Sequence, residues 1–355
     1  MTPGGAAPRP GLRDVDAYVS PQLDVAARLN TNECPYPLPS EFADDLARTV
    51  ADVPLNRYPD GRALRLREEL AERAGHSVEG TWVANGSNEI LTELLLAYGG
   101  PDRTAMTFEP TYLLHSRLAW ITHTRHISCH LPPPWSIGNA EIDAAREARP
   151  NVVFVCSPNN PTGNSQPVEA VDRLAESLPR SLVIVDEAYI EFGGKTAQEL
   201  LGTRTNLVIV RTFSKAFALA GARIGYCLAS PAVVEDLERV RLPYHLSSLT
   251  QAAGLAALRH ATDATALLDA VRRERDRILA ALGAMPGIDV FPSDANFVLF
   301  RPPPGRPAKE VWRALLERGV LVRDLTSVVP QGLRVTAGTS SEVELFLNAL
   351  REVLA

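Results

Sequence analysis

The sequence predicts an α/β fold in which a mainly parallel sheet is flanked by helices and a smaller α+β part follows. Three apolar runs rich in β-branched residues, at 152–155, 182–185 and 207–210, predict buried parallel strands. Helical sequence separates these runs, whose starts lie about 25 to 30 residues apart, which is the spacing of β–α–β units. Beyond residue 256, short strand patterns alternate with helical patterns, which indicates a second, α+β domain.

The chain divides into three predicted parts. At 355 residues it is longer than one compact core usually supports. Residues 1–40 are expected to form an N-terminal arm, because the stretch 29–37 is polar, interrupted by proline and without a regular period. We expect a large domain at 41–255 and a small C-terminal domain at 256–355.

Helical periodicity and turn residues place the other elements of the large domain. Two helices are expected at 40–50 and 62–74, with a turn at 56–61 between them. A short strand at 81–84 leads through a glycine turn into an apolar helix at 90–98.

The C-terminal third of the chain contains both helical and strand periodicities. A helix from about 231 to 260 is interrupted at 242–245, and an arginine- and glutamate-rich helix covers 272–282. The shorter elements are strands at 288–291, 296–300, 320–323 and 333–336 and helices at 309–318 and 341–354. These short strands and helices make up the predicted small domain.

Composition excludes several classes of protein. With 45% hydrophobic and 22% charged residues, the chain is typical of a soluble globular protein. The net charge of -6 and the scattered basic residues argue against binding to nucleic acid. No apolar run is long enough for a membrane span, and the N-terminus does not resemble a signal peptide. We therefore expect a cytoplasmic protein without a nucleic-acid or membrane partner.

Cysteine and histidine spacing gives no sign of a disulfide framework or a metal site. The four cysteines are widely spaced and form no C-x-x-C pair. A cluster in one β-like run lacks a recognised ligand spacing; its members are His123, His126, Cys129 and His130. We expect no metal.

Lys215 stands out among the basic residues. The chain has 36 Lys+Arg, yet its lysines are only Lys195, Lys215 and Lys309. A guanidinium stays protonated, whereas a partly desolvated lysine can lose its proton and form an imine. Lys215 directly follows the strand at 207–210, so it is expected at the carboxyl edge of the sheet, where α/β proteins bind ligands.

Polar side chains follow the other two parallel strands at the same edge. Asn160 comes after the first strand, and Asp186 and Tyr189 come after the second. Because the carboxyl ends of parallel strands meet at one edge, we expect these side chains to share a crevice with Lys215. An amine, a carboxylate for a pyridine nitrogen, and two donors for a phenolic oxygen suit pyridoxal phosphate.

The glycine turn after the strand at 81–84 is a candidate phosphate site. In Asn-Gly-Ser-Asn-Glu at 85–89, the backbone N–H groups that open the helix point outward and can cradle an anion. The same residues are also simply a good helix start.

Several ordered motifs together resemble the class I/II aminotransferases of fold type I. The motifs are Ser-Pro-Asn-Asn-Pro-Thr-Gly at 157–163, Asp-Glu-Ala-Tyr at 186–189, Thr-Phe-Ser-Lys at 212–215 and Arg-Ile-Gly at 223–225. From about residue 18 to the C-terminus, the chain is similar to the histidinol-phosphate aminotransferase branch of that family. The stretches that carry this likeness are 29–32, 57–60, 85–89, 241–247 and 333–339.

The resemblance implies a role for each residue that matches a cofactor-binding position. Lys215 would hold pyridoxal 5'-phosphate as an imine and then act as the base and acid of the proton shift. Asp186 would pair with the ring nitrogen, Tyr189 and Asn160 would donate to the phenolic oxygen, and Tyr112 would stack on the ring. The phosphate would be held by Ser87, Asn88, Thr212, Ser214 and Arg223.

The resemblance also implies the partners and the substrates. Tyr58 would reach the phosphate in the neighbouring subunit, so the active unit would be a homodimer with shared sites. Arg334 would bind the anionic end of a small amino donor or 2-oxo acid acceptor through a bidentate fork. Arg323 is a second candidate for that anion, and the remaining candidate substrate contacts are Tyr18, Asn32 and Tyr244.

Two departures from the family pattern concern the substrate. Cys34 stands where the family commonly has asparagine, and Ala17 stands where a proline often precedes the tyrosine matched by Tyr18.

The expected reaction is transamination between L-histidinol phosphate and 2-oxoglutarate in histidine biosynthesis. The alternatives are an aromatic or specialised-pathway aminotransferase, a threonine-phosphate decarboxylase-like lyase, and a cofactor-sensing regulator. Arg323 and Arg334 could also be surface residues, and Tyr112 and Tyr244 could be core aromatics.

Overall fold

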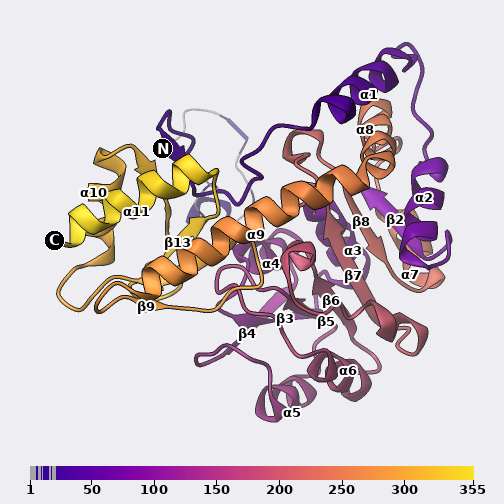
Figure 1. The fold of residues 1–355 in the computed structure, drawn as a ribbon. Helices are drawn as coiled ribbons and strands as arrows, with labels where there is room; N and C mark the ends of the chain where they lie inside the picture. The colour runs from indigo at the N-terminus through magenta and orange to yellow at the C-terminus, as the bar shows by residue number, and fades with distance from the viewer. Residues whose placement is uncertain (1–4, 7–8, 10, 16, 18–20) are drawn as a thin grey trace.

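The computed structural model describes residues 5–6, 9, 11–15, 17 and 21–355 of the chain. Tyr18 therefore lies outside the described residues. Figure 1 shows the long helix α9 (Ala261–Gly283) crossing the molecule, with α10 (Ala308–Glu317) and α11 (Ser340–Leu354) near one of its ends. The main sheet and the helices around it lie on one side of α9, away from these two C-terminal helices.

The main sheet has seven strands in the described part of the chain, in the order β2-β8-β7-β6-β5-β3-β4. Strands β3 to β7 run parallel, and β8 is antiparallel to both of its neighbours. The strands are β2 (Thr81–Ala84), β3 (Thr104–Glu109), β4 (Arg125–His130), β5 (Val152–Cys156), β6 (Leu182–Asp186), β7 (Leu207–Thr212) and β8 (Gly225–Leu228). The predicted parallel strands at 152–155, 182–185 and 207–210 are thus confirmed as β5, β6 and β7.

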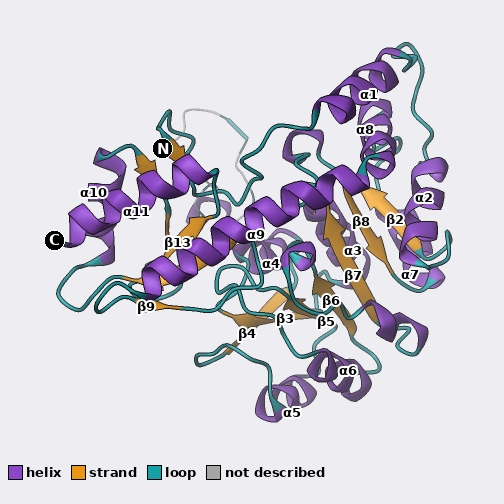
Figure 2. Ribbon diagram, in the orientation of Figure 1, coloured by secondary structure: helices purple, strands orange, loops and turns teal. Residues whose placement is uncertain are grey.

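Helices cover both faces of this sheet, as the apolar runs require (Figure 2). Because successive side chains of a strand point to opposite faces, Val153 and Val155 pack in one core cluster and Val152 and Phe154 in another. The first cluster includes α5 (Asn139–Ala148) and α6 (Val168–Ser177). The second includes α3 (Ser87–Tyr98), α4 (Leu113–Ile121) and α7 (Pro231–Val240).

A third group of helices packs beside the sheet, with its own apolar cluster. It consists of α1 (Ser40–Ala51), α2 (Leu64–Ala74) and α8 (Ser248–Arg259), and α8 contacts both of the others. The break between α7 and α8 confirms the predicted interruption at 242–245. The domain boundary that we propose at residue 255 falls inside α8.

The C-terminal part is built on a second, antiparallel sheet of four strands within the described residues, ordered β12-β13-β10-β9. These strands are β9 (Asp289–Val290), β10 (Phe297–Arg301), β12 (Arg323–Asp324) and β13 (Leu333–Thr336). A separate parallel pair joins β1 (Ala27–Arg28) to β11 (Val320–Leu321). Through this pair the N-terminal segment is attached to the C-terminal sheet region, and both contribute to one core cluster with α9, α10 and α11.

Three sequence-based expectations need correction. Helix α3 begins at Ser87 rather than at residue 90, because Gly86 supplies a φ of 79° at the turn. The strand expected at 320–323 is split into β11 and β12, which join different sheets. The helix expected at 272–282 begins at Ala261. Short 3₁₀ turns complete the described fold: η1 (Leu12–Asp14), η2 (Ile190–Phe192), η3 (Gln198–Gly202) and η4 (Ala220–Ala222).

None of the helices in the described ranges combines the length and the apolar character needed to cross a membrane.

Candidate active site

A cavity of about 480 Å³ lies where the carboxyl ends of the parallel strands meet the N-terminal segment and the C-terminal sheet. Most of the residues that the sequence singled out line it together. They are Asn32, Ser87, Asn88, Tyr112, Asn160, Asp186, Tyr189, Thr212, Ser214, Lys215, Arg223, Arg323 and Arg334. Four of its lining side chains are cationic groups and two are carboxyls, Glu33 and Asp186, which suits an anionic ligand.

One end of the cavity is an anion cradle. Ser87 and Asn88 open helix α3, and among the described residues no side chain caps that helix at its N-terminus. The Ser214 hydroxyl accepts hydrogen bonds from the Thr212 hydroxyl and from Arg223 Nη1, both at 3.0 Å. Backbone N–H groups at a helix start, two hydroxyls and a guanidinium together form a suitable site for a phosphate.

Two glycines allow this cradle to close. At Gly86 the backbone is left-handed, and an added Cβ would lie 2.5 Å from Arg223 Nη2. At Gly225 an added Cβ would lie 2.3 Å from the backbone of Gly86 and Ser87. Strand β8 can therefore pass directly beneath the start of α3 only because both positions lack a side chain.

Asp186 ends strand β6 and reaches the cavity while being only 2% exposed. His115 Nε2, from helix α4, lies 3.3 Å from Asp186 Oδ2, and the backbone N–H of Ala188 donates to Oδ1. His115 is fully buried and its ring stacks on Phe154, with centroids 4.5 Å apart. The histidine thus orients the Asp186 carboxylate, which still lines the cavity.

Lys215 projects into the cavity from the segment after β7 and is half-buried. Its Nζ donates to the carbonyl oxygen of Thr31 at 3.1 Å. Desolvation, and then the nearby Arg334 guanidinium, lower the pKa of Lys215 from 10.5 to about 8. A substantial neutral fraction near physiological pH makes this amine a nucleophile and a base.

Arg334, on strand β13, lines the same cavity as the anion cradle and is 6% exposed. Its Nη2 donates to the carbonyl oxygen of Asn30 at 2.9 Å, and its Nη1 donates to Asn160 Oδ1. Arg323 on β12 is its direct cross-strand neighbour. Like charges at directly opposed cross-strand positions destabilise each other, so an anion bound by both arginines would be stabilised.

Tyr189 and Tyr112 line the cavity in different ways. Tyr189 is 5% exposed, and its hydroxyl accepts a hydrogen bond of 3.0 Å from Asn32 Nδ2. Burial raises the pKa of Tyr189 to about 12, so the hydroxyl keeps its proton at neutral pH. Tyr112 precedes helix α4 and meets the edge of His115.

Tyr58 and Tyr244 do not reach the cavity of their own chain. Their rings stack on each other with centroids 4.5 Å apart, and they are 81% and 49% exposed. Leu242 is also exposed, so this region presents an apolar surface. Tyr244 is not among the residues that line this cavity, and its contact with the substrate stays a prediction.

The structure adds residues that the sequence reasoning missed. His115 follows Tyr112, which directly precedes α4, by three residues, and the two rings contact each other. This spacing at a helix start is the signal that could have found it. Thr31, Thr111 and Cys156 also line the cavity. Nothing local in the sequence distinguishes these three from structural residues.

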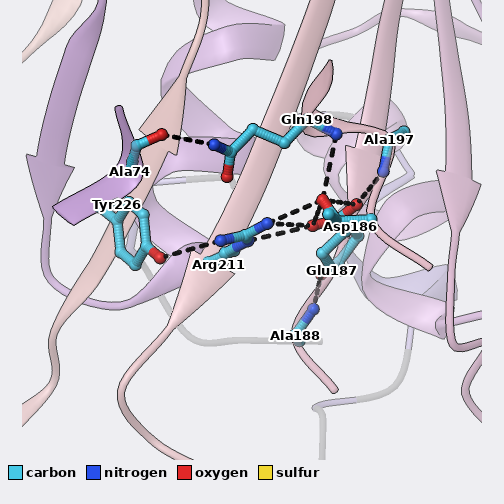
Figure 3. A network of polar contacts seen from close by, with 9 residues as sticks. Ala74, Asp186, Glu187, Ala188, Ala197, Gln198, Arg211 and Tyr226 are labelled. Carbon is cyan, nitrogen blue, oxygen red and sulfur yellow. Dashed lines mark hydrogen bonds and ion pairs between the residues drawn. The ribbon is translucent and has the colours of Figure 1, made fainter. Parts of the chain in front are cut away.

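Glu187, next to Asp186, is not among the residues that line the cavity and is instead hydrogen-bonded to Arg211 (Figure 3). Arg211 donates to Glu187 Oε2 through Nη2 at 2.8 Å and Nε at 3.0 Å. The Thr196 hydroxyl and the backbone N–H of Ala197 donate to the same carboxylate. Arg211 also donates to the hydroxyl of Tyr226. This network links the residue that follows β6 to strands β7 and β8.

Comparison with known proteins agrees with this site. Residues 26–350 match the family described as aminotransferase class I and II. A histidinol-phosphate aminotransferase from Thermobifida fusca (strain YX) is 46% identical over 350 residues, covering 96% of this chain and 94% of that protein.

Two solved structures have the same architecture at 25% identity. A histidinol-phosphate aminotransferase from Sinorhizobium meliloti, in complex with pyridoxal-5'-phosphate, aligns with a TM-score of 0.83 over 93% of this chain and 91% of that one. An L-threonine-O-3-phosphate decarboxylase from Porphyromonas gingivalis aligns with a TM-score of 0.78 over 92% of this chain and 99% of that one. With a basic lysine, a buried carboxylate and an anion cradle around one cavity, and with the family match over nearly its whole length, the chain belongs to the class I and II aminotransferases.

Proposed function

We propose that this aminotransferase uses pyridoxal 5'-phosphate to exchange an amino group between L-histidinol phosphate and 2-oxoglutarate, giving imidazole acetol phosphate and glutamate in histidine biosynthesis. The observation that carries this proposal is that one cavity brings together Lys215, whose pKa is about 8, a phosphate cradle and the Arg323–Arg334 pair. The 46% identity to a protein of that name over 96% of the chain supports the choice of substrate.

The residues present fit the cofactor. The start of α3, two hydroxyls and Arg223 match a phosphate, and the carboxylate of Asp186 matches a pyridine nitrogen. An oppositely charged carboxylate stabilises a protonated ring nitrogen. When bound, the cofactor supplies an electron sink for the charge that develops on the substrate carbon.

The side chains around the cavity then perform three tasks. Neutral Lys215 Nζ could take a proton from the substrate carbon that carries the amino nitrogen and deliver it to the carbon on the other side of that nitrogen. Asn160, whose Oδ1 accepts from Arg334, is oriented so that Nδ2 is its remaining donor, and together with the Tyr189 hydroxyl it stabilises a phenolic oxygen. Arg334 and Arg323 hold the anionic end of either substrate, since a guanidinium fork matches both carboxylate and phosphate.

We also propose that the active unit is a homodimer with shared sites. Tyr58 is 81% exposed, stacks on Tyr244 and lies in an apolar surface with Leu242, as expected for a residue covered by a second copy. Light scattering should give twice the chain mass of 38.5 kDa. Co-expression of K215A chains with Y58A chains should restore activity that each variant lacks alone, because one site of the mixed dimer keeps both residues. A monomeric mass, or no recovery in the mixture, would contradict shared sites.

A cytoplasmic location is part of the same proposal. The four cysteines Cys34, Cys129, Cys156 and Cys227 are free thiols, as is usual in a reducing compartment. The proposed reactants are small molecules of amino-acid metabolism.

The proposed reaction is tested by titrating the cofactor-loaded protein separately with L-histidinol phosphate, glutamate and phenylalanine, and following the visible absorbance of the cofactor. Conversion by histidinol phosphate and by glutamate at low concentration is the expected result. A strong response to phenylalanine alone would favour an aromatic aminotransferase. Absence of cofactor absorbance, or its persistence unchanged in K215A, would contradict the cofactor assignment.

The structural likeness to the Porphyromonas gingivalis decarboxylase gives a second candidate function. A lyase would release carbon dioxide from a phosphorylated amino acid without needing a 2-oxo acid. We expect no stoichiometric carbon dioxide from L-threonine O-3-phosphate, measured in the absence of 2-oxoglutarate.

A further inference from the structure

Asn32 is held in a conformation that few residues adopt. Its φ is +57°, in the left-handed region that asparagine tolerates better than most side chains. It is 1% exposed, and its carbonyl oxygen accepts from Asn296 Nδ2 at 3.1 Å. This hydrogen bond attaches the N-terminal segment to the C-terminal sheet region. The Asn32 side chain contacts Tyr189, which follows strand β6 of the main sheet.

The hydrogen bonds around Asn32 have a defined direction. Its backbone N–H donates to Thr336 Oγ1 at 3.1 Å, so that hydroxyl acts there as an acceptor. The Thr336 hydroxyl uses its own hydrogen to donate to Asn32 Oδ1 at 2.9 Å. With Oδ1 committed as an acceptor, the other end of the amide is Nδ2, which donates to the Tyr189 hydroxyl at 3.0 Å.

This chain of bonds decides what the Tyr189 hydroxyl can do. Because it accepts from Asn32, its single hydrogen is not used in that contact and can be donated into the cavity. Tyr189 keeps the hydrogen at neutral pH, since burial raises its pKa to about 12. The charged and titratable groups around it are Arg334 from β13, Asp186 from β6 and Cys156 from β5, with Lys215 Nζ 5.9 Å from its ring centroid.

We propose that Asn32, oriented by Thr336, is a positioning residue that makes Tyr189 a hydrogen-bond donor to the phenolic oxygen of the cofactor. The inference rests on the proposed function, because it needs that oxygen in the cavity. It gives Asn32 a role different from the substrate contact expected from the sequence. It also gives Thr336 a role, although Thr336 is 3% exposed and does not line the cavity.

The test is the pH midpoint of the absorbance change of the bound cofactor, which a purely structural contact would not move. A donor to the phenolic oxygen stabilises its anion and lowers this midpoint. In N32D the new carboxylate accepts from Tyr189 and withdraws the donor, so we expect the midpoint to rise by about one pH unit. Y189F should raise it similarly.

A double variant separates this mechanism from the added charge of aspartate. If Asn32 acts through Tyr189, N32D/Y189F should have the midpoint of Y189F alone. A carboxylate acting only by its charge would raise the midpoint in the Y189F background as well, and that result would overturn the proposal.

Thr336 provides a matched pair of variants that adds no charge. T336V removes the hydrogen that orients Asn32 and should raise the midpoint, whereas T336S keeps the hydroxyl and should retain the wild-type midpoint. Wild-type midpoints in both N32D and T336V would overturn the proposal. Thermal unfolding of the cofactor-free variants reports folding independently. A wild-type protein that shows no cofactor absorbance would refute the proposed function itself, which distinguishes the two failures.

Discussion

Asp186 and Glu187 are neighbours in sequence, are both buried, and are used in opposite ways. Glu187 is 1% exposed and accepts hydrogen bonds from Arg211, Thr196 and Ala197 (Figure 3). Asp186 is 2% exposed, and its carboxylate contacts a histidine at 3.3 Å and one backbone N–H at 3.2 Å. A buried carboxylate whose acceptor sites are all used stabilises the fold, whereas one with acceptor capacity toward a cavity is available for chemistry.

The largest expected effect comes from Asp186. D186A should lower kcat/KM by about 10²–10³-fold, because no carboxylate would remain to stabilise a protonated ring nitrogen. The thermal unfolding midpoint of the cofactor-free protein should change little, since Asp186 has few partners in the fold. Steady-state kinetics and calorimetry measure the two quantities. A variant that unfolds at much lower temperature while keeping its activity would reverse the roles assigned to the two carboxylates.

Substitution of Glu187 should lower the stability of the protein and leave its activity nearly unchanged. E187Q leaves Arg211 buried without its counter-ion, and breaking such a pair destabilises a protein by about 3–5 kcal/mol. Activity per folded molecule should stay within a few-fold of wild type. Denaturant unfolding measures the loss. The double variant E187Q/R211Q should recover part of it, because no unpaired charge remains. Equal stability of E187Q and wild type would remove the structural role.

The lowered pKa of Lys215 can be tested through its reaction with pyridoxal phosphate. Capture of pyridoxal phosphate by the cofactor-free protein should rise with pH and reach half its maximum near pH 8, because the neutral amine reacts. In R334Q one nearby positive charge is lost, so the midpoint should move up toward 10.5, the ordinary value. R334K is the matched control that keeps the charge and should leave the midpoint near 8. A downward shift in R334Q would contradict the electrostatic explanation.

The smallest effect concerns a third buried carboxyl, Glu93. Burial raises its pKa from 4.5 to about 8, and it accepts a hydrogen bond of 2.8 Å from Trp82 Nε1. Since the folded pKa is the higher one, its stabilising contribution is fully present below pH 4.5 and is lost as the pH rises through 8. E93Q stays neutral, so wild type should lose stability relative to E93Q by about 1 kcal/mol or more between pH 5 and pH 8. Parallel pH dependences of the two unfolding midpoints would contradict a protonated Glu93.

Much of the fold and part of the candidate site follow from local sequence patterns. The β-branched runs predict β5, β6 and β7 because a strand buried on both faces needs apolar side chains at every position. Parallel strands then bring Asp186 and Lys215 to one edge without knowledge of any other contact. The anion cradle follows from a glycine turn that opens a helix, which is also a local signal.

Other features depend on contacts between distant parts of the chain, which local patterns do not encode. Thr336 orients Asn32 across 304 residues, and Asn32 reaches Tyr189 across 157. Likewise, only the packing of α4 against the sheet brings His115 to Asp186, 71 positions away. Which side chains could do the chemistry follows from strand and helix periodicities, because these act over a few residues of the sequence. Which partners orient those side chains follows from the packing of the folded chain, because hydrogen-bond direction depends on where separate elements meet.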